Sequence, residues 1–178
     1  MYQTSLRHVK KKNVIDIMLN LKYCSYDIVF QEVPNETTLV FNISGCPHKC
    51  EGCHSKYLWD YVGKYVKEDY LKIIDRYNTF ITCVCFMGGD QNIEELYLFI
   101  KSIKEKYPNL KTCIYSGLQS ITSFSDLIND NIIDYLKIGP YIKEYGGLDS
   151  GKTNQKFYHI KNKEFEDLTH LFRKSYNA

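Results

Sequence analysis

Hydrophobic residues in the central part of the chain form short runs that end at turn-forming residues. Residues 37–43 (TTLVFNI) combine β-branched and aromatic side chains and are followed by a glycine and a proline, a pattern that predicts a strand. Residues 80–87 (FITCVCFM) are almost continuously apolar, which is typical of a strand buried on both faces. Shorter runs at residues 110–115 and 132–138 predict a third and a fourth strand.

Amphipathic segments separate these predicted strands. In residues 93–107, apolar side chains recur every three or four positions with charged side chains between them, which predicts a helix. The same spacing predicts helices at residues 68–77, 123–129 and 164–176. We interpret the last one as a terminal helix that packs on the protein, although its apolar face also suits docking to a partner.

The alternation of strands and helices favours right-handed βαβ units, so the expected fold class is α/β with a mainly parallel sheet. A closed barrel of eight such units usually needs about 250 residues. With 178 residues, the chain has room for a partial, open (βα) barrel in one domain. We expect an N-terminal extension over residues 1–22, a core domain over residues 23–160 and a helical C-terminal tail over residues 161–178.

Composition narrows the possible partners and the compartment. The formal net charge is +2, from 23 basic and 21 acidic side chains, so no strong field is expected to attract nucleic acid or an anionic membrane. No apolar run approaches the roughly 20 residues that cross a bilayer, and Asp16 interrupts the apolar stretch after the N-terminal lysines, which argues against a secretory signal. Seven cysteines, three of them close together, indicate metal or redox chemistry in a reducing compartment, and we expect the cytoplasm.

The candidate chemistry is concentrated just after the first predicted strand, where Cys46, Cys50 and Cys53 lie in the segment SGCPHKCEGCHSKYLW. Pro47 and Gly52 disfavour a regular helix, so a loop wrapped around a ligand is expected. Iron-sulfur clusters are normally held by four cysteine thiolates, so three closely spaced cysteines would leave one iron atom open to another ligand. This pattern predicts a cluster whose open iron atom carries the function.

A structural zinc site is the alternative, completed by His48, His54 or a distant cysteine. Structural zinc sites usually combine two pairs of ligands, and the sequence lacks the second pair, so we favour the cluster. We interpret both histidines as exposed loop residues, with a role beside the cluster as the alternative. The remaining cysteines are interpreted as small core side chains: Cys24, Cys83, Cys85 and Cys113.

Two motifs, in this order, resemble the radical S-adenosylmethionine (SAM) superfamily. Cys46-x3-Cys50-x2-Cys53 matches its cluster motif, and Gly88-Gly89-Asp90, after the second predicted strand, resembles its GGE motif. Gly52 stands before the third cysteine, where most members have an aromatic residue. This departure resembles the activating enzymes of anaerobic, class III ribonucleotide reductases.

The C-terminal half carries a second similarity to those reductase-activating enzymes. Residues 134–141 (DYLKIGPY) and the later Thr153-Asn154-Gln155 are similar to the D-G-P and S-N-Q regions of the family. Two features depart from it: Ile138 stands where many members have an acidic residue, and the usual Arg-Gly-Ser before Asn-Gln is missing. The resemblance extends over about residues 23–160.

The resemblance implies a radical SAM activase with a partial, open barrel of the radical SAM type. A [4Fe-4S] cluster on the three motif cysteines would bind SAM and cleave it reductively to a 5′-deoxyadenosyl radical, which abstracts hydrogen from a glycine of the large subunit of an anaerobic ribonucleotide reductase. An electron donor such as flavodoxin or ferredoxin is implied as a second partner. Gly88 and Gly89 would allow close approach of SAM, and Asp90 would accept a hydrogen bond from its amino group.

Alternatives remain for the site and for the function. Gly88-Gly89-Asp90 also fits an ordinary turn in which Asp90 caps the helix that begins near Ile93. Ser116, after the third predicted strand, is a candidate contact for the ribose or methionine part of SAM, and it also fits a plain turn. The alternative functions are a radical SAM enzyme that acts on another glycyl-radical enzyme or a small molecule, and a non-catalytic iron-sulfur or zinc module.

Overall fold

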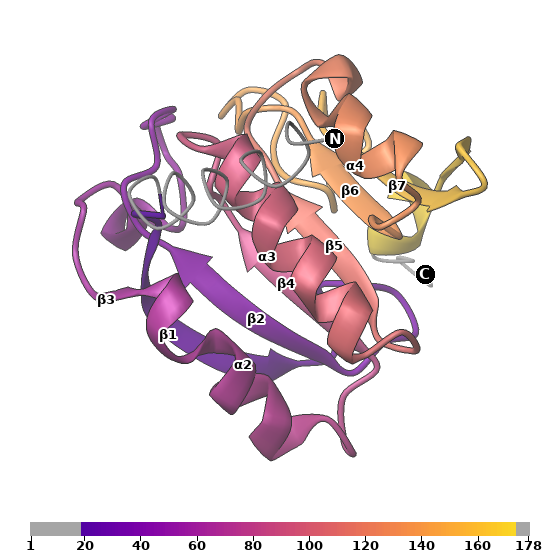
Figure 1. Cartoon of the computed structure of the whole chain (residues 1–178). Helices are drawn as coiled ribbons and strands as arrows, with labels where there is room; N and C mark the ends of the chain where they lie inside the picture. The colour runs from indigo at the N-terminus through magenta and orange to yellow at the C-terminus, as the bar shows by residue number, and fades with distance from the viewer. Residues whose placement is uncertain (1–18, 174–178) are drawn as a thin grey trace, which may run out of the picture.

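A mixed β-sheet forms the centre of the computed structural model, which describes residues 19–173 (Figure 1). Its strands follow the spatial order β3-β1-β2-β4-β5-β6-β7-β8. The strands are β1 (Lys22–Val29), β2 (Thr38–Ile43), β3 (Lys64–Tyr65), β4 (Cys83–Met87), β5 (Lys111–Tyr115), β6 (Tyr135–Ile138), β7 (Lys156–Lys161) and β8 (Glu164–Asp167). The helices are α2 (Val66–Tyr77), α3 (Ile93–Lys106), α4 (Ser125–Asn129) and the short 3-10 helices η1 (Lys56–Leu58), η2 (Ile121–Phe124) and η3 (Thr169–Phe172).

The middle of the sheet is parallel and its two sides are antiparallel. β2, β4, β5 and β6 pair in parallel, whereas β1 with β3, on one side, and β7 with β8, on the other, add antiparallel pairs. The expectation of a mainly parallel sheet is therefore wrong, because the α/β fold is built on a mixed sheet. The outer strands were not predicted, because many of their side chains face solvent and do not form apolar runs. Every residue of β8 is exposed.

The strands and helices predicted between residues 37 and 138 are confirmed, with shifted ends. β4 begins at Cys83 instead of residue 80, and β6 begins at Tyr135 instead of residue 132, because the chain is still turning at the omitted residues. Each parallel pair is joined through one α-helix: α2 lies between β2 and β4, α3 between β4 and β5, and α4 between β5 and β6. The expected βαβ connectivity is therefore present in the middle of the sheet.

The three α-helices cover one face of the sheet, as Figure 1 shows. Phe41 of β2 and Phe86 of β4 pack there with Ile74 of α2 and Ile100 of α3 in the main hydrophobic core. Burial of such side chains is the principal stabilising contribution to the fold. None of the described helices is long and apolar enough to cross a bilayer.

The opposite face of the sheet carries a second core cluster. It includes Cys83, Cys85 and Cys113, all fully buried. The interpretation of these three cysteines as core side chains is confirmed. Cys24 differs, because it is half-buried on β1 and its thiol lies 3.5 Å from the backbone oxygen of Asn42.

The helix predicted over residues 164–176 is wrong within the described part of the chain. Residues 164–167 form β8, the second strand of a hairpin with β7, and η3 follows. The hairpin turn consists of Asn162 and Lys163, whose φ values of 52° and 68° are those that a type I′ turn requires. The apolar residues that suggested a helix pack onto β7 in separate places: Phe165 on Tyr158, and Phe172 on Phe157.

Candidate cluster and cofactor site

The parallel strands bring the predicted site residues to one edge of the sheet. The cysteine loop follows β2, Gly88-Gly89-Asp90 follows β4, and Ser116 follows β5. Lys137 lies in β6, one residue before the strand ends. Parallel strands end at a common edge, and open α/β sheets bind their ligands there. Four segments that are distant along the chain therefore meet at the place where a ligand is expected.

The segment that carries the three cysteines is an irregular loop, as predicted. Gly52 has a positive φ of 75°, a conformation that favours glycine. The N–H of Cys53 donates to the backbone oxygen of Cys50 at 3.1 Å, which closes a turn. The N–H of Cys46 donates to the backbone oxygen of Leu58 at 2.8 Å and fixes the start of the loop. All three thiols are half-buried.

The three thiols share an electrostatic environment with Lys137 and Asp90. Burial lowers the pKa of the Lys137 amine to about 8, whereas the negative charges of Asp90 and of all three motif cysteines act in the opposite direction. Burial raises the pKa of the Cys46 thiol; two backbone N–H groups of the loop oppose that shift, and the charges of Asp90 and Cys50 add to it. The Lys137 amine is therefore within electrostatic range of Asp90 and of all three thiols.

Within residues 19–173, no three side chains of His, Cys, Asp or Glu are grouped as ligands of a single metal ion. Ligands of one zinc ion surround a common centre, whereas each thiolate of a [4Fe-4S] cluster binds a different iron atom. A cluster therefore needs its thiols spread over a wider loop than zinc does. Cys46, Cys50 and Cys53 all lie in the loop of residues 46–53, and their ligation of a cluster stays a prediction.

Asp90 has one bonded and one free carboxylate oxygen. Oδ2 accepts hydrogen bonds from Nε2 of His48 at 2.6 Å and from the N–H of Gly117 at 2.8 Å. Oδ1 is buried and has no hydrogen-bond partner in the described structure. A buried polar atom without a partner is unfavourable by about 1–3 kcal/mol. This oxygen is therefore available to a ligand that carries an N–H group.

Two interpretations of this region are wrong. Asp90 does not cap α3, because the cap is Asn92, whose side chain accepts a hydrogen bond from the N–H of Glu95 at 3.1 Å. His48 is not an exposed loop residue, because its side chain is only 21% exposed and is bonded to Asp90. His54 is exposed, as expected.

The backbone conformation at positions 88 and 89 requires glycine. Their φ values are 95° and 100°, which L side chains rarely adopt. A Cβ on Gly89 would lie 2.8 Å from the side chain of Leu96. Gln91, directly after the motif, donates from Nε2 to the backbone oxygen of Ser44 at 2.8 Å and joins the turn to the start of the cysteine loop. The two glycines hold the turn that positions the carboxylate, and their contact with SAM stays a prediction.

Lys137 is the site residue that sequence reasoning missed. Its side chain is buried, and Nζ donates to the backbone oxygens of Gly139 at 2.7 Å and of Ser116 at 3.3 Å. An ammonium group has three donors, so these two bonds leave one for a ligand. The signal in the sequence was a lysine inside an otherwise apolar strand. Lysine is almost never fully buried unless it is paired, so a lysine at such a position indicates a specific partner.

Ser116 and Asn154, two further residues of the predicted region, have structural roles. The buried Ser116 hydroxyl accepts a hydrogen bond from the N–H of Leu118 at 2.9 Å and so forms part of a turn. Its contact with SAM stays a prediction. Asn154 donates from Nδ2 to the backbone oxygen of Pro140 at 2.9 Å and supports the chain after β6.

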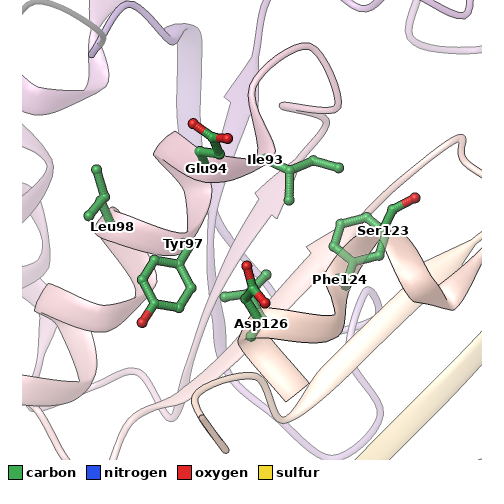
Figure 2. Close-up of a pocket in the computed structure, with 8 residues that line it drawn as sticks. Ile93, Glu94, Tyr97, Leu98, Ser123, Phe124 and Asp126 are labelled. Atoms are coloured by element: carbon green, nitrogen blue, oxygen red, sulfur yellow. The ribbon is translucent and has the colours of Figure 1, made fainter. Parts of the chain in front are cut away.

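A groove of about 420 Å³ lies on the helical side of the molecule, between α3 and the η2–α4 segment. Figure 2 shows Tyr97 and Leu98 of α3 opposite Phe124 and Asp126. The predicted site residues do not line this groove. It is therefore separate from the candidate site.

Two proteins that are named as anaerobic ribonucleoside-triphosphate reductase-activating proteins are similar to this chain. The chain is 25% identical to the anaerobic ribonucleoside-triphosphate reductase-activating protein of Enterobacteria phage T4, over 67% of this chain and 82% of the phage protein. It is 24% identical to the protein of the same name from Pasteurella multocida (strain Pm70), over 66% of this chain and 78% of that protein. No solved structure gives a significant match. The expected resemblance to reductase-activating proteins is thus confirmed.

A family model described as a 4Fe-4S single cluster domain matches residues 36–157. This range runs from just before β2 into β7 and includes the cysteine loop, Asp90 and Lys137. Since the match covers more than half of the chain, the chain belongs to the 4Fe-4S single cluster domain family.

Proposed function

We propose that this chain is a radical SAM activase that generates a glycyl radical on an anaerobic ribonucleotide reductase. The observation that carries the proposal is the meeting of a three-cysteine loop with two buried charges, the Asp90 carboxylate with its free oxygen and the Lys137 ammonium. The names of both relatives, as activating proteins of an anaerobic ribonucleoside-triphosphate reductase, support the choice of protein substrate.

The cysteine loop suits a [4Fe-4S] cluster with three protein ligands. Cys46, Cys50 and Cys53 would bind three of the four iron atoms and leave the fourth open. Lys137 is within electrostatic range of all three cysteines, whose negative charges act to raise the pKa of its amine. The buried cysteines of the second core cluster are already packed among apolar side chains.

Asp90 and Lys137 suit the amino-acid part of SAM. The SAM amino group would donate to Oδ1 of Asp90, and the SAM carboxylate would accept from the remaining N–H of Lys137. The cluster and SAM together supply the one-electron cleavage of the sulfonium to methionine and a 5′-deoxyadenosyl radical, chemistry that belongs to the cofactors. The chain itself orients SAM and keeps water away from the reacting atoms.

The proposed fold for this activity is a partial, open barrel of the radical SAM type. The parallel set β2-β4-β5-β6, with α2, α3 and α4 on one face, supports it. An open barrel would admit a loop of a second protein that a closed barrel would exclude. A glycine in such a loop is a suitable target, since it has no side chain to obstruct approach and its flanking amides stabilise a radical.

Anaerobic reconstitution with iron and sulfide, followed by reduction and a SAM cleavage assay, tests the proposal. We expect methionine and 5′-deoxyadenosine from the unaltered chain, and neither product from Cys46→Ala, Cys50→Ala or Cys53→Ala. Cys83→Ala is the matched control, because this buried cysteine should affect only stability. A bound cluster without SAM cleavage would instead indicate an electron-transfer module.

The protein substrate needs a separate test. A reductase large subunit with deuterated glycine would be mixed with the reconstituted chain, SAM and reduced flavodoxin or ferredoxin. Deuterium should move into 5′-deoxyadenosine, since the radical takes hydrogen from the glycine Cα. SAM cleavage without deuterium transfer would point to another glycyl-radical enzyme or to a small-molecule substrate.

A further inference from the structure

His48 joins the cysteine loop to the carboxylate that we assign to SAM. It lies between Cys46 and Cys50, and its Nε2 is 2.6 Å from Oδ2 of Asp90. An ionised carboxylate only accepts hydrogen bonds, so His48 is the donor. Hydrogen bonds with an ionised partner are shorter and stronger than neutral ones. The loop that follows β2 and the turn that follows β4 are therefore joined by a strong side-chain contact.

The ring of His48 also lies closely against Gly117, after β5. A Cβ on Gly117 would lie 2.7 Å from Cγ of the ring, so the ring occupies space that only a glycine leaves open. The N–H of Gly117 donates to the same oxygen of Asp90, at 2.8 Å. Groups from the ends of β2 and β5 thus hold the carboxylate that follows β4.

Two donors on Oδ2 fix the Asp90 carboxylate and leave Oδ1 free. The Asp90 side chain is 3% exposed, so solvent has little access to the free oxygen. We infer that His48 is a positioning residue: it holds Asp90 so that Oδ1 receives the amino group of SAM, and it makes that recognition depend on the fold of the cysteine loop. The inference rests on the proposed function and gives the loop a second task besides holding iron.

Three variants of the loop separate positioning from a general structural role. His48→Phe keeps an aromatic ring and removes the donor, whereas His48→Gln retains an N–H donor. His54→Phe is the matched control, an exposed histidine of the same loop whose ring lies 5.9 Å from that of Tyr141. Each protein is reconstituted with iron and sulfide, its iron content is counted, and equilibrium dialysis measures the binding of SAM and of 5′-deoxy-5′-methylthioadenosine, which lacks the amino-acid group.

The expected result is a loss that is selective for the amino-acid group. His48→Phe should weaken SAM binding about 10-fold or more, the usual effect of losing a hydrogen bond to a charged group. Methylthioadenosine binding and iron content should stay unchanged. His48→Gln should recover most of the SAM affinity, and His54→Phe should match the unaltered chain. Gly117→Ala should reproduce the selective loss, because its Cβ displaces the ring while the loop sequence is intact.

Equal weakening of both ligands by His48→Phe, or an unchanged SAM affinity, would overturn the inference. If that variant loses iron, Gly117→Ala decides instead, and a normal SAM affinity in Gly117→Ala would then contradict the positioning role. Failure of the unaltered, iron-loaded chain to bind SAM is a distinct result, because it contradicts the proposed function and removes the inference with it.

Discussion

Asp90 and Lys137 are buried charges of opposite sign near the cysteine loop: Lys137 interacts with Asp90 and with all three thiols, and Asp90 interacts with Cys46. Asp90 has a carboxylate oxygen without a partner, and Lys137 uses two of its three donors on backbone carbonyls. Buried charges are unfavourable unless they are paired and hydrogen-bonded. A zwitterion such as the amino-acid part of SAM would donate to the free oxygen of Asp90 and accept from the unused N–H of Lys137.

Lys137→Met should weaken both ligand binding and stability. SAM affinity should fall about 10-fold or more, because a charge-assisted hydrogen bond to the carboxylate is lost. The free energy of unfolding of the iron-free chain should fall by about 1–3 kcal/mol, because the backbone oxygens of Gly139 and Ser116 lose the donor that Lys137 supplies. Equilibrium dialysis and urea unfolding measure the two effects, and Lys152→Met, at an exposed position, is the control. A normal SAM affinity would remove Lys137 from the proposed carboxylate site.

Candidate site residues with an informative spacing along the chain are predictable from the sequence, whereas residues that meet only in space are not. The cysteines and Gly88-Gly89-Asp90 are recognisable from local order. His48 and Asp90 are 42 positions apart, so no local pattern shows that they are bonded. Lys137 becomes a site residue only because β6 pairs beside β5 and ends at the same edge as the cysteine loop.

At the level of elements, hydrophobic patterns identified the strands buried on both faces and missed those at the sides. β2 and β4 are buried along nearly their whole length. β1 has one buried residue, Tyr23, among exposed and half-buried positions, and β8 is exposed throughout. Antiparallel edge strands carry a weaker sequence signal because only part of their surface is packed. The α/β class was therefore predictable, and the mixed sheet was not.

Asp167 connects β8 to η3 and should make this corner sensitive to acid. Oδ1 accepts a hydrogen bond from the N–H of Thr169 at 2.9 Å, and Oδ2 accepts one from Nζ of Lys156 at 2.9 Å. Partial burial acts to raise the pKa of Asp167, but the hydrogen bonds from Thr169 and Lys156 outweigh it and hold the pKa at about 2. The unfolded value is about 3.9, so this stabilisation is complete above about pH 4 and is lost as the pH falls toward 2.

Asp167→Asn should therefore lower the free energy of unfolding by about 1 kcal/mol at pH 7, less than the full linkage value because water screens an exposed pair. The Asp167 side chain is 41% exposed. Urea unfolding followed by circular dichroism should show the two proteins approaching each other between pH 4 and pH 2. Glu166→Gln is the control, because the neighbouring Glu166 side chain is more exposed than that of Asp167. It should change neither the free energy of unfolding at pH 7 nor its dependence on pH between 4 and 2. An unaltered acid response in Asp167→Asn would assign the effect to another carboxylate.

At the level of the whole molecule, the cysteine loop is a long irregular segment on a well-packed sheet. Lys49 and Lys56 are exposed in and just after this loop and are sites for trypsin. Binding of a cluster should order the loop and slow cleavage at both, because a ligand stabilises the conformation that binds it. Limited proteolysis with mass spectrometry, before and after reconstitution, measures this. Cleavage at Lys163, in the β7–β8 turn, should stay constant; equal protection there would indicate a global effect instead.

The candidate site is built from β6 and from the loops that follow β2, β4 and β5, and α2, α3 and α4 contribute none of its groups. Substitutions on the exposed sides of these helices therefore leave the site unaltered. Related chains are free to diverge on these helix surfaces, and matches of 24% and 25% identity are consistent with such divergence. Searches for distant relatives should accordingly compare the strand-end segments first and give little weight to identity along the helices.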